Sequence, residues 1–188
     1  LPAFREEDGS SRILYFWNHA TSVPDRFPTV TLPEGGPRSY SYGSEWTAVD
    51  IESQAFTFTD PGAHGTHVAG ITSGRDPQFP GVAPGAWLLG VNNEGSEPGD
   101  IWQGAGTLDA YECLLSRARE LGLPLVVNES QGTSLGPHDG STLFEQALHH
   151  DVTSPERNLI AVISAGNRQA EGKHARVEVP AQGRVTVR

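Results

Sequence analysis

The chain has 188 residues, of which 36% are hydrophobic, so it is long enough for one domain with a substantial core. Its formal net charge of −10 at pH 7 argues against nucleic acid or an anionic membrane as a partner. The single cysteine, Cys113, excludes an internal disulfide framework, and no run of residues reaches the length of a membrane-spanning helix.

The first third of the chain is predicted to be mostly irregular. Residues 12–17 combine aliphatic and aromatic side chains, which favours a short strand. The prolines and glycines of residues 18–45 predict a long loop, and such loops are usually functional or poorly ordered. A short helix or a surface turn is expected at 45–55, followed by a helix at about 64–74.

Three apolar runs in the rest of the chain predict strands. They lie within residues 82–92 and over 125–128 and 159–163. All three are expected to be buried, and the run 125–128 is expected to be buried on both faces. Alternating valines near the end of the chain indicate a hairpin around Gly183.

Two helices are predicted between these strands. Apolar residues repeat at helical spacing over 107–121, where Thr107 and Asp109 can cap the first turn. A second helix is expected over 141–150, with Ser141 as its cap. The alternation of strands and helices implies a parallel sheet covered by helices, with catalytic groups at the carboxyl ends of the strands.

Residues 62–71 read Gly-Ala-His-Gly-Thr-His-Val-Ala-Gly-Ile and place His64 at the start of a helix. The partial positive charge of a helix N-terminus favours the neutral imidazole, which can accept a proton. Gly65 keeps the space beside the ring open, while Val68 and Ile71 are expected to bury the helix. The stretch therefore indicates a rigidly mounted general base.

Two other interpretations of this stretch are available. It can be a core helix whose two histidines make ordinary structural contacts. It can also be a metal site, because His64 and His67 are three residues apart on one helical face. The zinc-protease pattern H-E-x-x-H, however, needs a spacing of four and a glutamate, and both are missing.

The sequence H-G-T-H-V-A-G-I at 64–71 resembles the histidine motif of the subtilisin-like serine peptidases, the subtilases. Two later segments follow in the order of that family. N-E-S-Q-G at 128–132 stands at the place of the N-x-S-x-G segment, whose backbone pairs with an extended substrate. A-G-N at 165–167 resembles the segment that supplies the oxyanion-hole amide.

This resemblance implies an α/β fold of the subtilisin-like three-layer kind, with a mostly parallel sheet and helices on both faces. It also implies a serine endopeptidase that hydrolyses a polypeptide substrate through an acyl-enzyme. In that mechanism His64 is the general base and then the general acid, and Asn167 is the oxyanion donor. The substrate cleft would include four residues of one segment: Asn128, Ser130, Gln131 and Gly132. No metal ligand is expected among the site residues.

A catalytic triad also needs an Asp to orient the histidine and a Ser to attack. The family places them in D-[ST]-G upstream of the histidine and in G-T-S-x-A after A-G-N. Asp60 lacks that context, and Ser134 precedes Asn167 and is followed by Leu-Gly-Pro, which cannot start a helix. We therefore expect residues 1–170 to be the central part of a subtilase domain that is cut on both sides, with the β-rich insertion or hairpin starting at 171–188.

The absence of methionine, together with the leading Leu1, supports the same expectation of a processed product or an excised piece. Such a piece is expected to be inactive by itself. Residues 2–13 and 136–140 bring the resemblance nearest to bacterial subtilases of the spore-germination type. Subtilases often bind calcium, although no acidic cluster here has suitable ligand spacing, and the family suggests a secreted or cell-envelope location.

Two rival functions remain. One is a non-catalytic relative, a pseudopeptidase that acts as a binding or scaffold module on the same fold. The other is a doubly wound ligand-binding domain that shares only the fold. The second would need a phosphate loop or a cofactor fingerprint, and the sequence contains neither. The sequence does not indicate an oligomeric state.

Overall fold

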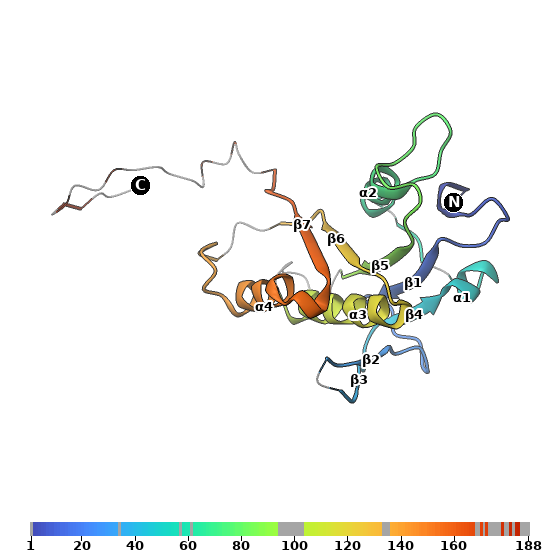
Figure 1. The fold of residues 1–188 in the computed structure, drawn as a ribbon, viewed down its shortest axis with the longest axis horizontal. Coiled ribbons are helices and arrows are strands. Elements are labelled where there is room, and N and C mark those ends of the chain that lie inside the picture. Colours follow the sequence, from blue (N-terminus) through green and yellow to red (C-terminus); the bar gives the residue numbers. More distant parts are fainter. Residues whose placement is uncertain are drawn as a thin grey trace.

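The computed structural model describes residues 2–33, 35–56, 58–60, 62–93, 104–132 and 136–167, together with residues 170, 172, 178, 181, 183 and 184. From the helix that starts at His64 to the strand that ends at Ile163, long helices and strands alternate as the sequence predicted, whereas four strands follow one another before it (Figure 1). The predicted hairpin around Gly183 lies largely outside the described residues, as does most of the loop 93–106. None of the described helices is both long and apolar enough to cross a bilayer.

The strands form two larger sheets and a small hairpin. In the first sheet β1 (Ile13–Asn18) is central and pairs antiparallel with β4 (Ser44–Thr47) and parallel with β5 (Leu88–Asn92). In the second sheet β6 (Leu125–Glu129) and β7 (Leu159–Ile163) pair in parallel. The hairpin consists of β2 (Thr29–Thr31) and β3 (Pro37–Ser39).

Helices lie on both sides of the strands, although not on both faces of each sheet. Figure 1 shows α2 (His64–Ser73) on one side of the strands and α3 (Ala105–Leu121) and α4 (Leu143–Thr153) on the other. A short helix α1 (Ala48–Glu52) follows β4, and 3₁₀ turns form η1 (Pro2–Phe4) and η2 (Pro155–Arg157). The α/β fold is thus confirmed, with parallel pairing in two of the four strand pairs of the described residues.

The prediction that residues 18–45 are loop is wrong for part of that stretch, because β2, β3 and the start of β4 lie within it. Long-range contacts with α3 stabilise the hairpin. The backbone N–H of Thr31 donates to Ser116 Oγ at 3.0 Å, and Arg119 donates to the carbonyl of Thr31 at 3.0 Å. Val30, the middle residue of β2, is buried in one cluster with Trp17. Such contacts cannot be inferred from a segment rich in proline and glycine.

The predicted caps were wrong at the starts of both long helices. Helix α3 begins earlier than expected, after Gly104, so Thr107 lies inside the helix and is buried. Asp109 instead accepts a hydrogen bond from Tyr42 Oη at 2.6 Å. Helix α4 is capped by Thr142, not Ser141, because Glu145 completes a reciprocal capping box with Thr142.

The predicted burial was wrong on one face of the second sheet. Leu125, Val127 and Leu159 face α3 and are buried, whereas Val126 and Ile160, paired across the ladder, are 64% and 62% exposed. These strands are apolar on both faces, as strands in a sheet with two covered faces usually are. The described residues cover only one of those faces.

Helix α2 is also more open than expected. Ile71 was predicted to be buried but is exposed, and the only buried residue of the helix is Ser73 near its end. The carbonyl of Ser73 accepts a hydrogen bond from the fully buried Arg12 at 2.8 Å. That contact attaches the end of α2 to the start of β1.

An aromatic cluster beside β1 encloses a buried histidine. The ring of His19 lies 4.0 Å from that of Trp17 and 5.1 Å from that of Tyr42, measured between centroids. Its Nε2 atom has no hydrogen-bond partner in the described structure. Burial lowers the pKa of His19 from 6.5 to about 4, because a charged imidazolium would lose its hydration there.

We expect the free energy of unfolding to fall as the pH is lowered from 6.5 to about 4. In the unfolded chain His19 binds a proton at its ordinary pKa of 6.5, whereas in the folded chain it does so only near pH 4. The stability that neutral His19 contributes is therefore complete above pH 6.5 and is lost as the pH falls to about 4. The loss should reach about 3 kcal/mol. Urea unfolding at several pH values measures it, and His19→Phe should show a smaller slope. Equal slopes in both proteins would contradict the assignment.

Candidate active site

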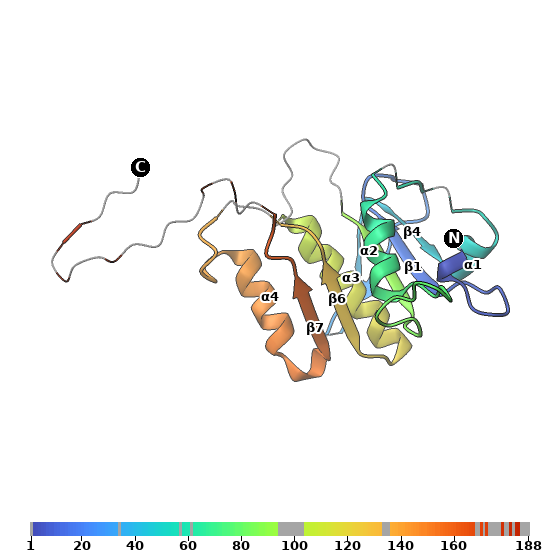
Figure 2. The same cartoon turned by 90° about the horizontal axis from the view of Figure 1, so that it is seen from above.

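The helix α2 brings His64 to the edge of the sheet where the strands end. α2 leads into β5, and its last residue, Ser73, contacts Arg12 just before β1. Because β1 and β5 are parallel, α2 therefore runs against both strands and starts near their carboxyl ends. Figure 2 shows the arrow of β7 pointing toward the same end of the molecule at which α2 begins. His64 is exposed there.

The first turn of α2 has an unusual start. Ala63 occupies the N-cap position in the left-handed conformation, with φ of 53°, and supplies no side-chain cap. Asp60 does this instead, because its Oδ2 atom accepts hydrogen bonds from the backbone N–H and the hydroxyl of Thr66, both at 2.8 Å. These bonds lower the pKa of Asp60, and the nearby His64 adds a smaller effect in the same direction.

Sequence reasoning missed this role of Asp60. The aspartate was considered only as a triad member and was set aside because it lacks the D-[ST]-G context of the family. A carboxylate three residues before an N-cap position that is not Ser, Thr, Asp or Asn is a signal that could have identified the cap. Its effect is to hold the turn that carries His64.

The predicted substrate segment 128–132 packs against the end of β7. Ser164 donates its backbone N–H to the carbonyl of Glu129 at 3.0 Å and its hydroxyl to the carbonyl of Gln131 at 2.6 Å. A Cβ atom added at Gly132 would lie 3.8 Å from the Cα atom of Gly166. The two backbone segments therefore approach closely, and the structure brings segment 128–132 next to the A-G-N segment.

The polar side chains of this segment have different surroundings. Asn128 is exposed and donates to Ser130 Oγ at 2.9 Å. Glu129 lies on the opposite face, where it accepts a hydrogen bond from Tyr111 Oη at 2.9 Å and where burial raises the pKa of its carboxyl group. Glu129 therefore contacts α3 and not the exposed edge.

Asn167 follows Gly166, whose φ of 82° turns the chain after β7. The asparagine side chain is exposed, like that of His64, and the two make no hydrogen bond to each other in the described part of the chain. Two residues that sequence reasoning did not single out also lie at this edge. Asn93 follows β5 and pairs with Gln131, and Ser164 follows β7.

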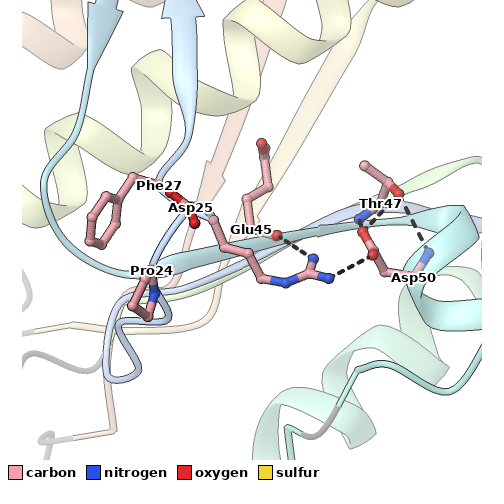
Figure 3. A pocket seen from close by; sticks show the side chains of 7 residues that line it. Pro24, Asp25, Phe27, Glu45, Thr47 and Asp50 are labelled. Carbon is pink, nitrogen blue, oxygen red and sulfur yellow. Dashed lines mark hydrogen bonds and ion pairs between the residues drawn. The ribbon is translucent and has the colours of Figure 1, made fainter.

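One hollow in the described part of the chain is lined by none of these residues. It has a volume of about 440 Å³ and is lined by Pro24, Asp25, Arg26, Phe27, Glu45, Thr47 and Asp50 (Figure 3). Arg26 donates to Asp50 at 2.9 Å and thereby lowers the pKa of that carboxyl group to about 2. None of the predicted site residues lines this hollow. We place the candidate active site instead at the edge of the sheet, where segment 128–132 contacts the end of β7 and where α2 begins. Among the described residues no group of three or more His, Cys, Asp or Glu could hold a metal ion.

Comparison with known proteins defines the class. The model of the subtilase family matches residues 33–187, and the chain belongs to that family. Subtilisin DY of Bacillus licheniformis is 31% identical over 126 residues, which are 66% of this chain and 41% of that protein. Tripeptidyl-peptidase 2 of Arabidopsis thaliana is 36% identical over 113 residues, or 58% of this chain and 8% of that protein.

A solved structure supports the fold. The Clostridium perfringens CspB protease superposes with a TM-score of 0.67 at 24% identity, over 89% of this chain and 33% of that one. The chain therefore spans less than half the length of each of these relatives.

We expect Ala63→Gly to raise the free energy of unfolding by about 0.5–1 kcal/mol. Alanine pays a steric cost in the left-handed region that glycine avoids, and part of that gain is offset by the greater freedom of glycine in the unfolded chain. Ala69→Gly, in the interior of the same helix, is the matched control and should lower stability by about 1 kcal/mol. Urea unfolding measures both, and equal losses would argue against strain at position 63.

Proposed function

We propose that these residues form part of a serine endopeptidase that hydrolyses peptide bonds through an acyl-enzyme. The observation that carries the proposal is the packing of segment 128–132 against the A-G-N segment, at the same edge of the sheet where α2 presents His64. Membership of the subtilase family supports the same chemistry.

In this mechanism His64 takes the proton of a serine hydroxyl while the hydroxyl oxygen attacks the scissile carbonyl. The side-chain amide of Asn167 donates a hydrogen bond to the oxyanion that forms. His64 then gives its proton to the leaving amine, and the acyl-enzyme is hydrolysed by a water molecule that His64 deprotonates. The serine and the orienting aspartate would come from polypeptide other than residues 1–188, since no G-T-S-x-A follows Asn167 in them.

The substrate would be a polypeptide in extended conformation lying along segment 128–132. Main-chain groups in an extended segment point alternately to its two sides. The carbonyls of Glu129 and Gln131 already accept hydrogen bonds from Ser164. A substrate strand would therefore pair with the main-chain groups of the alternate residues, Ser130 and Gly132.

The organisation of the chain follows from the same proposal. Residues 1–170 are the central part of the catalytic domain, and residues 171–188 begin a β-rich insertion or hairpin. A polypeptide of these 188 residues alone is inactive, because it has the general base and the oxyanion donor without a nucleophile.

We expect the complete gene product to hydrolyse a fluorogenic peptide. His64→Ala should lower kcat by about 10⁴-fold or more, because the serine then has no base. Asn167→Ala should lower kcat by about 10²–10³-fold with little change in KM, since the amide acts on the oxyanion. His149→Ala, an exposed histidine on α4, is the matched control and should leave both constants unchanged.

The 188-residue polypeptide should show no turnover in the same assay. Turnover by this piece that disappears on His64→Ala would mean that the nucleophile lies within it and that the proposed boundaries are wrong. A complete gene product that binds peptides but never cleaves them would instead support the pseudopeptidase.

A further inference from the structure

A pair of side-chain amides joins the ends of two strands that are not neighbours in one sheet. Asn93 follows β5 directly, and Gln131 lies two residues after β6. Asn93 Nδ2 donates to Gln131 Oε1 at 3.1 Å, and Gln131 Nε2 donates back to Asn93 Oδ1 at 2.7 Å. We call this contact the amide pair.

The amide pair is anchored on both sides. Asn93 Nδ2 also lies 3.2 Å from Thr107 Oγ1, a buried hydroxyl in the first turn of α3. The main-chain carbonyl of Gln131 accepts the hydroxyl of Ser164 at 2.6 Å. The contact thus connects the chain after β5, the start of α3, the segment after β6 and the end of β7.

The position of this contact matters because no backbone hydrogen-bond ladder joins the two sheets in the described part of the chain. Within the described residues, β5 is the last strand of the sheet β4-β1-β5, and β6 pairs only with β7. Helix α2 with His64 leads into β5 of the first sheet and contacts Arg12 beside β1, whereas Asn167 follows β7 of the second sheet. At this edge the amide pair therefore bridges the sheets where ladder hydrogen bonds do not.

We propose that Asn93 and Gln131 are positioning residues that set the spacing between the general base and the oxyanion donor. The inference rests on the proposed function, because it assigns the two sheets to two halves of one reaction site. A reciprocal amide pair is directional, and loss of either partner removes both hydrogen bonds of the pair from the remaining, partly buried amide. A misplacement of about 1 Å can cost about 10²-fold in rate, so a small shift between the sheets would be measurable.

The test compares four variants of the complete gene product: Asn93→Leu, Gln131→Leu, the double variant, and the exchange Asn93→Gln with Gln131→Asn. Each leucine should lower kcat about tenfold with KM changed less than about twofold. The double variant should be no worse than the poorer single one, because both remove the same contact. The exchange keeps the combined length of the two side chains and should recover most of kcat.

Gln146→Leu is the matched control. Its amide donates to the carbonyl of Ser141 at 2.8 Å on the exposed face of α4, so kcat and KM should stay unchanged. Leucine variants with wild-type kcat, or single losses that multiply in the double variant, would overturn the proposal. A loss of kcat that persists in the variant Asn93→Gln with Gln131→Asn would also overturn the proposal, since that result indicates packing alone.

Amide hydrogen exchange separates this inference from the proposed function. In Gln131→Leu the amides of residues 128–132 and 164–167 should exchange about tenfold faster than in Gln146→Leu, with α4 unaffected. Equal exchange would overturn the amide pair as a tie between the sheets. If the unmodified protein cleaves no peptide but the exchange rates differ as expected, the proposed function fails while the tie between the sheets stands.

Discussion

Helix α3 is the element through which the two sheets pack together. One of its faces buries Tyr111 and Leu115 against Leu125 and Leu159 of the second sheet, with Leu89 of β5 at the border of the same cluster. Another face packs Cys113 in the cluster formed around Trp17 of β1. Because the sheets share no ladder in the described residues, this packing is what holds their strand ends at one edge.

Polar contacts on α3 add direction to that packing. Arg117 donates to Glu45 of β4 at 2.6 and 2.8 Å and lies over the ring of Tyr15. Tyr111 donates to Glu129 at 2.9 Å on the opposite side. Apolar contacts tolerate sliding, whereas hydrogen bonds fix orientation, so these residues determine how the sheets lie relative to each other. The amide pair of Asn93 and Gln131 provides the same control at the edge that carries the candidate site.

The open face of the second sheet is the other notable property of the described structure. Val126, Ile160 and Val162 lie exposed on it, although each is a strand residue of the kind normally buried. The chain spans 41% of subtilisin DY and 33% of the CspB protease. Apolar residues on both faces of β6 and β7 show that the sequence of these strands suits a sheet covered on both sides.

The sequence by itself determined the class of fold, the position of the long helices and the motif that defines the family. The apolar periodicity of one segment and a contiguous motif such as that of residues 64–71 are local properties of the sequence. They can be recognised without knowing what each segment packs against. Even the ending of α3 at Gly122, with φ of 67°, follows from a local signal. The starts of α3 and α4 were wrong because several adjacent polar residues can cap a helix, and tertiary contacts select among them.

Only the tertiary structure decided the rest. The hairpin held by Ser116 and Arg119 and the amide pair across 38 residues join parts of the chain whose sequences carry no sign of each other. These hydrogen bonds all involve α3 or the strand ends that pack against it. Single side chains at such contacts are chosen by three-dimensional distance, which local sequence patterns do not encode.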